Sequence, residues 1–414
     1  MTDFTPLYSP LAARGFAPQP PLAEQPMRYN FGQGLAALET FPMSAFKDIM
    51  NRVVDQYGPP LFEYFDPRNS GADDMAYGDL GLRRELLRML EKRDGRKLSP
   101  DEIAVTSGSV HALALAVMAY LGPGDGAVVE ETTFRCPLHA MRCAGSEVAS
   151  VPVDDDGLVI EAVERQFEQF RAKGIRPKMI YTIPTFNLPT GACLSLPRRR
   201  ALIELAKKWD VVILEDNVYG HLRYDGDTLP TLLAMDNNGD DSGRVIQTES
   251  FSKTIAPGLR VGWVAGSRAA LAPIISLRTS QDFGISQFLA RVMTLFLAEG
   301  RFEPHVAAAN AVYKRKRDIA VAAMEEHCGR WVRFKRPLGS FYLWIELKPE
   351  LDWEGVRVNA VKEGVFCRPG ESFTTGGSHK HYLRLAFSHS SEDEIRGGIE
   401  ILGRVMAAHA RQSA

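Results

Sequence analysis

The sequence predicts an α/β fold, with a large domain built on a mainly parallel seven-stranded sheet and covered by helices, followed by a smaller α+β domain. Three observations lead to this prediction. Between about residues 80 and 265, short apolar runs alternate with segments of helical periodicity, the pattern of βαβ units. Several runs are apolar at every position, as strands covered on both faces must be. After about residue 270 the pattern changes to long helices and a short mixed tail.

In the large domain each helix begins or ends near Gly, Pro or Asp, which are common at helix termini and turns. The expected strands are Ile103–Thr106, Ala127–Glu130, Glu147–Val151, Met179–Thr182, Val211–Glu215, Val245–Thr248 and Val261–Ala265. The expected helices between them are Gly81–Lys92, Val110–Leu121, Phe134–Ala144, Gly157–Ala172 and Pro197–Lys208.

The last third of the chain predicts long helices and then a small sheet. Its expected helices are Ala269–Arg278, Ser286–Glu299, His305–Cys328 and Ser391–Ala408, and its expected strands are Val332–Arg336, Gly339–Leu347, Val365–Arg368 and His381–Phe387. We therefore expect three parts: an N-terminal arm (1–45) that joins the small domain, a large domain (46–290), and a linking helix with the small domain (291–414).

Composition and charge exclude several classes of function. The 414 residues carry a formal net charge of -2, so no broad basic surface for nucleic acid is expected. The longest apolar stretch, Ala112–Leu121, is about half of what a membrane-spanning helix needs. The N-terminus lacks the pattern of a signal peptide. The five cysteines form no metal-binding spacing, so we expect no metal site and reduced thiols in a cytoplasmic protein.

Polar residues that directly follow apolar strands are the candidate site residues, because ligands bind at the carboxyl ends of the strands in such sheets. The turn Ser107-Gly108-Ser109-Val110 opens a helix, so it is either an anion site or a simple cap and tight turn. Asp216 ends a very apolar strand and needs a cation nearby to stay ionised, unless it only caps a helix.

A lysine and an arginine follow a later strand. Lys253 lies among small hydroxyl residues, where an amine is placed to form an imine rather than to be a surface charge. Arg260, seven residues further on, could pair with a phosphate in a fork geometry. Each of these residues alone also has a surface-loop explanation.

Taken together, these segments resemble a known family. SFSKTIAPGLRVGW (residues 250–263) resembles the lysine segment of fold type I pyridoxal-phosphate enzymes, in the class I and II aminotransferase family related to aspartate aminotransferase. The remaining motifs follow the order of that family: YGDLGLR (77–83), SGSVHAL (107–113), EETTF (130–134), PTFNLPTG (184–191), LEDNVYG (214–220) and HYLRLAFS (381–388). The resemblance runs from about residue 30 to the C-terminus.

The resemblance implies pyridoxal 5'-phosphate as cofactor and a catalytic role for three residues. Lys253 would form an aldimine with the cofactor and carry the proton between the substrate Cα and C4′ of the cofactor. Asp216 would pair with the protonated pyridine nitrogen. Tyr219, which could otherwise be a core aromatic residue, would bind the phenolic oxygen, and Phe134 would stack on the ring.

The same resemblance implies how the phosphate and the substrate are held. Arg384 would clamp the substrate α-carboxylate, although a strand-end surface arginine is the simpler interpretation without the family. Gly34 would line the same pocket from the N-terminal arm. The groups implied for the phosphate are Ser250, Ser252, Arg260, the backbone N–H groups of Ser109 and Val110, and Tyr77 from the neighbouring subunit of a homodimer with shared active sites.

The sequence departs from the family pattern at two places. The family usually has Asn before Pro-Thr-Gly to bind the cofactor's phenolic oxygen, whereas here Leu188 stands there and Asn187 precedes it. Either the loop presents Asn187 to cofactor and substrate, or Tyr219 works alone. Gly339-Ser340 replaces the usual Gly-Gly, and His111 follows the phosphate loop as a packing, capping or participating residue.

The leading expectation is a ping-pong aminotransferase that moves an amino group from an L-amino acid to a 2-oxo acid such as 2-oxoglutarate. The alternative within the fold is another reaction of the same carbanion: elimination, decarboxylation or oxidation and cyclisation. A transcription regulator would need a DNA-binding segment, and the roughly 30 residues before the core are expected to be too few. No second arginine stands out for a distal carboxylate, and the candidate specificity residues are Tyr29, Phe31, Phe283 and Phe341.

Overall fold

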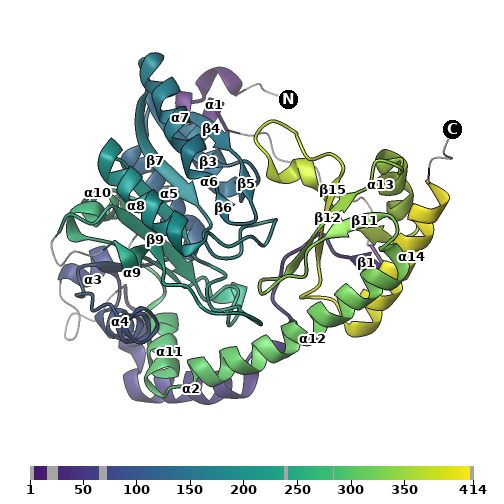
Figure 1. Cartoon of the computed structure of the whole chain (residues 1–414). Coiled ribbons are helices and arrows are strands. Elements are labelled where there is room, and N and C mark those ends of the chain that lie inside the picture. The colour runs from purple at the N-terminus through teal and green to yellow at the C-terminus, as the bar shows by residue number, and fades with distance from the viewer. Residues whose placement is uncertain (1–3, 16–26, 65–71, 237–240, 283, 411–414) are drawn as a thin grey trace.

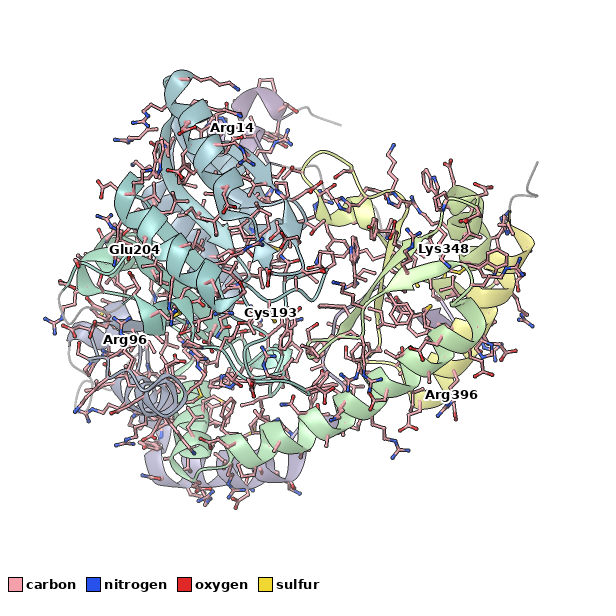
Figure 2. The ribbon with its side chains drawn as sticks, viewed as in Figure 1. Arg14, Arg96, Cys193, Glu204, Lys348 and Arg396 are labelled. Atoms are coloured by element: carbon pink, nitrogen blue, oxygen red, sulfur yellow. The ribbon has the colours of Figure 1, made fainter. Side chains whose placement is uncertain are left out.

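The computed structural model describes residues 4–15, 27–64, 72–236, 241–282 and 284–410. Figure 1 shows two lobes, and the long helix α12 (Phe302–Cys328) runs along one side of both and joins them. Charged side chains project outward from both lobes, as Glu204 and Arg396 do in Figure 2. No helix in the described ranges is both long and apolar enough to cross a membrane.

The large lobe contains the predicted seven-stranded sheet, which confirms the fold class. Its strand order is β2-β10-β9-β8-β7-β3-β4, and only β10 runs antiparallel to its neighbours. The strands are β2 (Ile103–Thr106), β3 (Asp125–Glu130), β4 (Glu147–Val151), β7 (Arg176–Thr182), β8 (Val212–Asp216), β9 (Val245–Ser250) and β10 (Gly262–Ala265).

The sheet is buried on both faces, which explains its continuous apolar strands. Successive residues of β8 alternate between the two cores, Ile213 packing in one and Val212 and Leu214 in the other. One core is covered by α2 (Met43–Tyr57), α4 (Leu80–Asp94), α7 (Ile160–Ala172), α8 (Leu196–Trp209) and α11 (Gln287–Ala298). The other is covered by α5 (Ser109–Tyr120), α6 (Arg135–Ala144) and α10 (Arg268–Arg278).

The small lobe is an antiparallel sheet packed on helices. Its strand order is β11 (Val332–Phe334), β12 (Tyr342–Leu347), β15 (Tyr382–Ala386) and β14 (Arg368–Pro369), and α12, α13 (Trp353–Lys362) and α14 (Glu392–Ala408) flank it. The N-terminal strand β1 (Tyr29–Asn30) pairs in parallel with β13 (Val365–Phe366) of this lobe. The domain boundaries at residues 45 and 290 stay a prediction.

Short elements complete the described chain. They are η1 (Thr5–Leu7), α1 (Pro10–Ala13), η2 (Leu38–Thr40), η3 (Pro59–Phe62), α3 (Ala72–Tyr77), β5 (Val153–Asp154), β6 (Gly157–Leu158), α9 (Leu232–Met235), η4 (Pro257–Leu259) and η5 (Gly370–Phe373). The helix expected from Gly157 begins at Ile160 because β5 and β6 form a hairpin there. The strand expected from Gly339 begins at Tyr342, since Ser340 has a left-handed φ of 64° and its N–H binds Leu222 instead.

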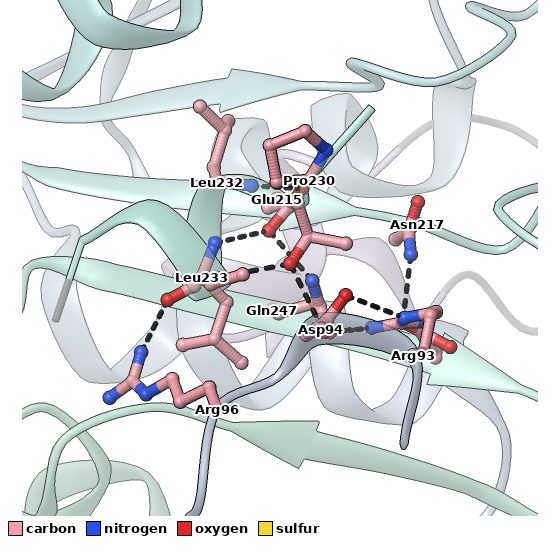
Figure 3. Close-up of polar contacts among 12 residues, drawn as sticks. Arg93, Asp94, Arg96, Glu215, Asn217, Pro230, Leu232, Leu233 and Gln247 are labelled. Carbon is pink, nitrogen blue, oxygen red and sulfur yellow. Dashed lines mark hydrogen bonds and ion pairs between the residues drawn. The ribbon is translucent and has the colours of Figure 1, made fainter. Parts of the chain in front are cut away.

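A buried polar network holds the carboxyl ends of β8 and β9 (Figure 3). Arg93 of α4 and Asn217 are labelled in Figure 3. Arg93 donates to the Glu249 carboxylate at 2.5 Å, and the Asn217 amide donates to the same oxygen at 2.8 Å. Burial acts to raise the pKa of Glu249, but Arg93 and its other partners outweigh this and hold it at about 2. One residue before Asp216, Glu215 accepts the N–H groups of α9 at Leu232 and Leu233, each at 3.0 Å.

The Glu249–Arg93 pair predicts a specific acid sensitivity. The folded-state pKa of Glu249 lies below its ordinary value of 4.5, so its stabilisation is present above about pH 4.5 and is lost as the pH falls towards 2. The Glu249→Gln change leaves the buried Arg93 with Asp94 as its remaining carboxylate partner, so it is expected to cost about 2–3 kcal/mol. Denaturant titrations at several pH values would measure both effects.

The matched control is Glu204→Gln, which removes an exposed carboxylate and should leave the free energy of unfolding within about 0.5 kcal/mol. Below about pH 4.5 the Glu249→Gln curve should fall less steeply than that of the wild type. Parallel curves for the two proteins would contradict the proposed acid sensitivity.

Candidate active site

A cavity of about 490 Å³ lies between the two lobes, at the carboxyl ends of the central strands. Residues of the N-terminal arm, the large sheet and the small sheet all contribute to its wall. The structure brings most of the predicted site residues together here: Gly34, Ser109, Val110, Phe134, Asp216, Tyr219, Ser250, Ser252, Lys253, Arg260 and Arg384.

Asp216, the last residue of β8, is the buried acid of this wall and is 2 % exposed. Tyr181 of β7 donates its hydroxyl to Oδ2 at 3.0 Å, whereas Oδ1 is buried and has no hydrogen-bond partner in the described protein. Burial raises the pKa of Asp216 to about 7, against the lowering effect of Tyr181. A protonated nitrogen in the cavity would therefore stabilise the carboxylate, because it would satisfy Oδ1 and supply the missing positive charge.

Lys253 follows β9 and directs its amine into the same cavity. Its Nζ donates to the Gly34 carbonyl at 2.6 Å and lies about 6 Å from the ring centroids of Tyr219 (6.0 Å) and Phe341 (5.9 Å). The amine is thus held by one backbone oxygen beside aromatic rings, a contact that a covalent or hydrogen-bonded partner can replace. The N-terminal arm, which carries Gly34, therefore helps to position this lysine.

Tyr219 is joined to a residue that the sequence analysis did not identify, Tyr342 of β12. Their hydroxyl groups lie 2.6 Å apart, and burial together with Tyr342 raises the pKa of Tyr219 well above its ordinary value. A Cβ at position 34 would overlap the Tyr342 hydroxyl, so Gly34 makes room for this pair. The guanidinium of Arg384 lies over the Tyr342 ring at 4.5 Å.

The turn before α5 has the geometry of an anion site. Gly108 has a φ of +82° and precedes Ser109, the first residue of the helix, whose N-terminal N–H groups face an anion favourably. Arg260 packs against the turn and donates to the Ser107 carbonyl at 2.9 Å and to Ser252 at 3.4 Å. A Cβ on Gly108 would overlap the Arg260 guanidinium, which explains the glycine.

Asn187 does not line the cavity, so the structure does not place it where it was expected to bind cofactor or substrate. Its amide donates to the Thr132 carbonyl at 3.2 Å and accepts from the Thr190 hydroxyl at 2.8 Å, which stabilises its own turn. Leu188 lies in the wall instead. His111 accepts the Ser107 N–H at 3.2 Å and lies 3.4 Å from Asp282, as a packing residue does.

Tyr77 also lies outside the cavity wall, beside Arg83, whose guanidinium is 5.4 Å from the ring centroid. Three of the proposed specificity residues, Tyr29, Phe31 and Phe341, are core residues and do not line the cavity, and Phe283 lies outside the described residues. The wall is formed instead by Leu35, Ile183, Leu188, Val218, Phe373, Arg135 and Arg368, among others.

Strand alternation and the observed register together place Arg368 and Tyr342 on the face of the small sheet that carries Arg384. Tyr342 and Arg384 carry even numbers on antiparallel neighbours and lie on one face of the small sheet, as does Arg368 on the other side of Arg384. Leu343, Ile345, Leu383 and Leu385 fill the core on the opposite face. Only the register shows which residues are opposite each other, and the sequence does not provide it.

Comparisons with known proteins agree with this geometry. The family model described as Aminotransferase class I and II matches residues 67–402. Aromatic-amino-acid aminotransferase 1 of Thermococcus litoralis is 32% identical over 373 residues, which cover 90% of this chain and 86% of that protein. The solved structure of Pyrococcus horikoshii kynurenine aminotransferase, in complex with PMP, has a TM-score of 0.84 at 32% identity, and the match covers 93% of this chain and 92% of that one.

A third relative bears on the regulator hypothesis. An uncharacterized HTH-type transcriptional regulator of Bacillus subtilis, YdfD, is 28% identical over 375 residues, which cover 90% of this chain but 73% of the regulator. The similarity therefore leaves about a quarter of that protein unmatched.

The residues around the cavity fit pyridoxal phosphate. The unpaired Oδ1 of Asp216 suits a protonated ring nitrogen, the amine of Lys253 suits a carbonyl carbon, and the turn beside Arg260 suits a phosphate. Among the residues described, no cluster of His, Cys, Asp and Glu suits a metal ion. The family match and the relatives agree with this chemistry. The chain belongs to the class I and II aminotransferase family, and it is a pyridoxal-phosphate-dependent aminotransferase.

Proposed function

We propose that this aminotransferase transfers the amino group of an L-amino acid to 2-oxoglutarate, in two half-reactions that use one cavity in turn. The observation that carries the proposal is the buried, unpartnered Oδ1 of Asp216 in the same cavity wall as Lys253. The cavity thus contains a carboxylate, Asp216, that needs a cationic ring nitrogen, and an amine, Lys253, that can transfer a proton. A wall that is mainly apolar, with Leu35, Ile183 and Val218, favours a broad donor range that includes aromatic side chains.

The cofactor would be held by residues from the large lobe. When bound, it supplies an electron-withdrawing ring that stabilises negative charge on the substrate Cα. Asp216 would bind the ring nitrogen, Tyr219 the phenolic oxygen, and Phe134 would pack on the ring. The phosphate would be bound by Ser250, Ser252, Arg260 and the N–H groups of Ser109 and Val110.

Lys253 would take the proton from the substrate Cα and would deliver a proton to C4′ of the cofactor. A lysine does this well when it is held close to the carbon and partly shielded from water. The Gly34 carbonyl and the rings of Tyr219 and Phe341 provide that setting. The α-carboxylate would bind Arg384, whose guanidinium lies between the rings of Tyr342 and Phe373 and whose buried Nε has no partner in the described protein.

Tyr342 would take over part of the task of the asparagine that Leu188 replaces. Leu188 offers no hydrogen bond to the phenolic oxygen, so of the two donors expected for that oxygen only Tyr219 is left. With Tyr219 donating to the phenolic oxygen, Tyr342 would donate to the Tyr219 oxygen across their 2.6 Å contact. This makes the Tyr219 hydroxyl a better donor, because hydrogen bonds in a chain polarise one another. Tyr342 of the small lobe thus compensates for the missing asparagine donor to the phenolic oxygen. This compensation supports transamination over the other carbanion reactions.

We further propose a cytoplasmic homodimer in which Tyr77 of each subunit reaches the phosphate of the other. The likeness of the segment YGDLGLR to the family motif supports this arrangement. The five cysteines are all free thiols, which suits a reducing compartment.

The proposed function predicts an acceptor-dependent turnover. Mixed with an amino acid donor alone, the enzyme should form one equivalent of the 2-oxo acid per site, while the absorbance of its cofactor shifts to that of the amine form. Added 2-oxoglutarate should restore the absorbance and give continuous turnover. Lys253→Ala should slow the first half-reaction by more than about 10³-fold, since the proton-transfer group is gone.

Lys173→Ala, a change at an exposed lysine, is the matched control and should keep the wild-type rate. Continuous product formation without any 2-oxo acid would contradict the aminotransferase proposal and favour elimination, decarboxylation or oxidation.

The Tyr342–Tyr219 contact predicts a spectroscopic effect. In Tyr342→Phe, Tyr219 becomes a weaker donor, so the anionic form of the phenolic oxygen is stabilised less. The pH midpoint of the absorbance change of the bound cofactor should therefore move upward. Tyr120→Phe removes a hydroxyl that donates to Ala270 and serves as the control. An unchanged midpoint in Tyr342→Phe, with the cofactor still bound, would show that the contact is only structural.

A further inference from the structure

We propose that Arg368 forms a second anion subsite in the active-site cavity, which binds the distal carboxylate of a dicarboxylic amino acid or 2-oxo acid. This inference rests on the proposed function, in which Arg384 binds the α-carboxylate. It assigns a recognition group to the class of acceptor that 2-oxoglutarate represents.

Two arginines face each other across neighbouring strands of the small sheet. Arg368 of β14 is the register partner of Arg384 of β15, so both side chains lie on the same face. Both line the cavity, and both donate to one oxygen, the Gly32 carbonyl: Arg368 through Nε at 3.1 Å and Arg384 through Nη2. The two guanidinium groups are therefore fixed side by side on the N-terminal arm, in the cavity wall.

This pair of charges is unfavourable unless anions join it. Like charges directly opposite each other destabilise a sheet, and a buried cation needs a counterion. Within the described ranges, neither guanidinium forms an ion pair with a carboxylate, and the Gly32 carbonyl is the hydrogen-bond acceptor that they share. Burial and, next, Arg384 lower the pKa of Arg368 to about 10, in the direction that a missing counterion produces.

Arg368 and Arg384 differ in burial and in surroundings, so they suit different carboxylates of a substrate. Arg384 is buried between the rings of Tyr342 and Phe373, whereas Arg368 is only partly buried. Arg368 also lines a second hollow of about 470 Å³ against α5 and α6, which shares Val110 and Arg135 with the first cavity. A substrate whose α-carboxylate binds Arg384 thus has space to extend its side chain past Arg368.

The phosphate does not account for this charge. The anion turn before α5 has its own cation in Arg260, which is anchored to the Ser107 carbonyl in the large lobe. Arg384 accounts for one carboxylate of the substrate. Arg368 is the other cation that the small sheet places in the cavity wall, so it matches a second carboxylate, and monocarboxylic donors would leave it to water.

The test compares Arg368→Gln with the wild type, both loaded with pyridoxal phosphate. Binding of two unreactive acids, glutarate and butyrate, is measured from the change in absorbance of the bound cofactor. The first half-reaction is measured with L-glutamate and with its neutral isostere L-glutamine. Arg333→Gln, at an exposed position of the same sheet, is the matched control.

In Arg368→Gln we expect glutarate binding and the rate constant for glutamate at low concentration to fall roughly 10- to 100-fold, the loss typical of a charged hydrogen bond. Butyrate and glutamine should change less than about threefold, and Arg333→Gln should match the wild type throughout. An equal loss for both members of each pair would overturn the proposal, because Arg368 would then act on the α-carboxylate. No loss for either acid would overturn it as well.

If the proposed function is wrong, the measurements on the wild type will differ from those that would overturn the Arg368 subsite. The wild type would then bind the acids but convert no amino acid in the half-reaction. Glutarate binding, which needs no turnover, would still report on Arg368.

Discussion

The unpaired oxygen of Asp216 is the constraint on which the site depends. A carboxylate at the end of a strand buried on both faces loses its hydration, and only one of its two oxygens regains a partner, the Tyr181 hydroxyl. The other oxygen is left for a cationic ligand in the cavity. In the proposed function this oxygen binds the ring nitrogen of the cofactor, and unsatisfied buried polar groups of this kind are common at functional sites.

The rest of the large lobe holds this point in place. Residues alternate along β8 and β9, so Glu215 and Glu249 lie on the face opposite Asp216 and are fully paired there, with α9 and with Arg93. Those contacts fix the strand ends without using the cavity face. The Lys253 amine, which follows β9, is held by the N-terminal arm through Gly34. Three distant parts of the chain therefore meet at one sheet edge.

In the proposed function, the small lobe contributes the recognition of the substrate. Its sheet presents polar side chains on one face and an aliphatic core on the other, and the N-terminal strand adds the Gly32 carbonyl between two arginines. Because β1 pairs with β13 of this lobe, backbone hydrogen bonds join the arm to the small lobe.

The sequence was sufficient to predict the site residues that stand directly after apolar strands. Lys253, Asp216 and Arg260 follow apolar strands, and the carboxyl ends of parallel strands meet at one edge, so their proximity could be predicted. It was not sufficient where the position depends on pairing. Arg368 and Arg384 stand opposite each other because of the register between the antiparallel strands β14 and β15. No local sequence motif contains that register.

The departure at Leu188 shows the same limit within a single loop. The sequence left open which of Asn187 and Leu188 faces the site, because a tight turn can present either neighbour. The hydrogen bonds of Asn187 to Thr132 and Thr190 decide it in favour of Leu188. Three of the expected aromatic specificity residues, Tyr29, Phe31 and Phe341, lie in a core and not in the cavity wall. Burial in a core and lining of a cavity give the same apolar pattern in a sequence, so the sequence does not distinguish them.

The most direct measurement is the protonation state of the cofactor's ring nitrogen in the assembled enzyme. Nitrogen NMR of protein reconstituted with nitrogen-labelled pyridoxal phosphate reports it without any turnover. We expect a protonated nitrogen at neutral pH in the wild type and an unprotonated one in Asp216→Asn, with the cofactor still bound. An unprotonated nitrogen in the wild type, or the same signal in both proteins, would contradict the role given to Asp216.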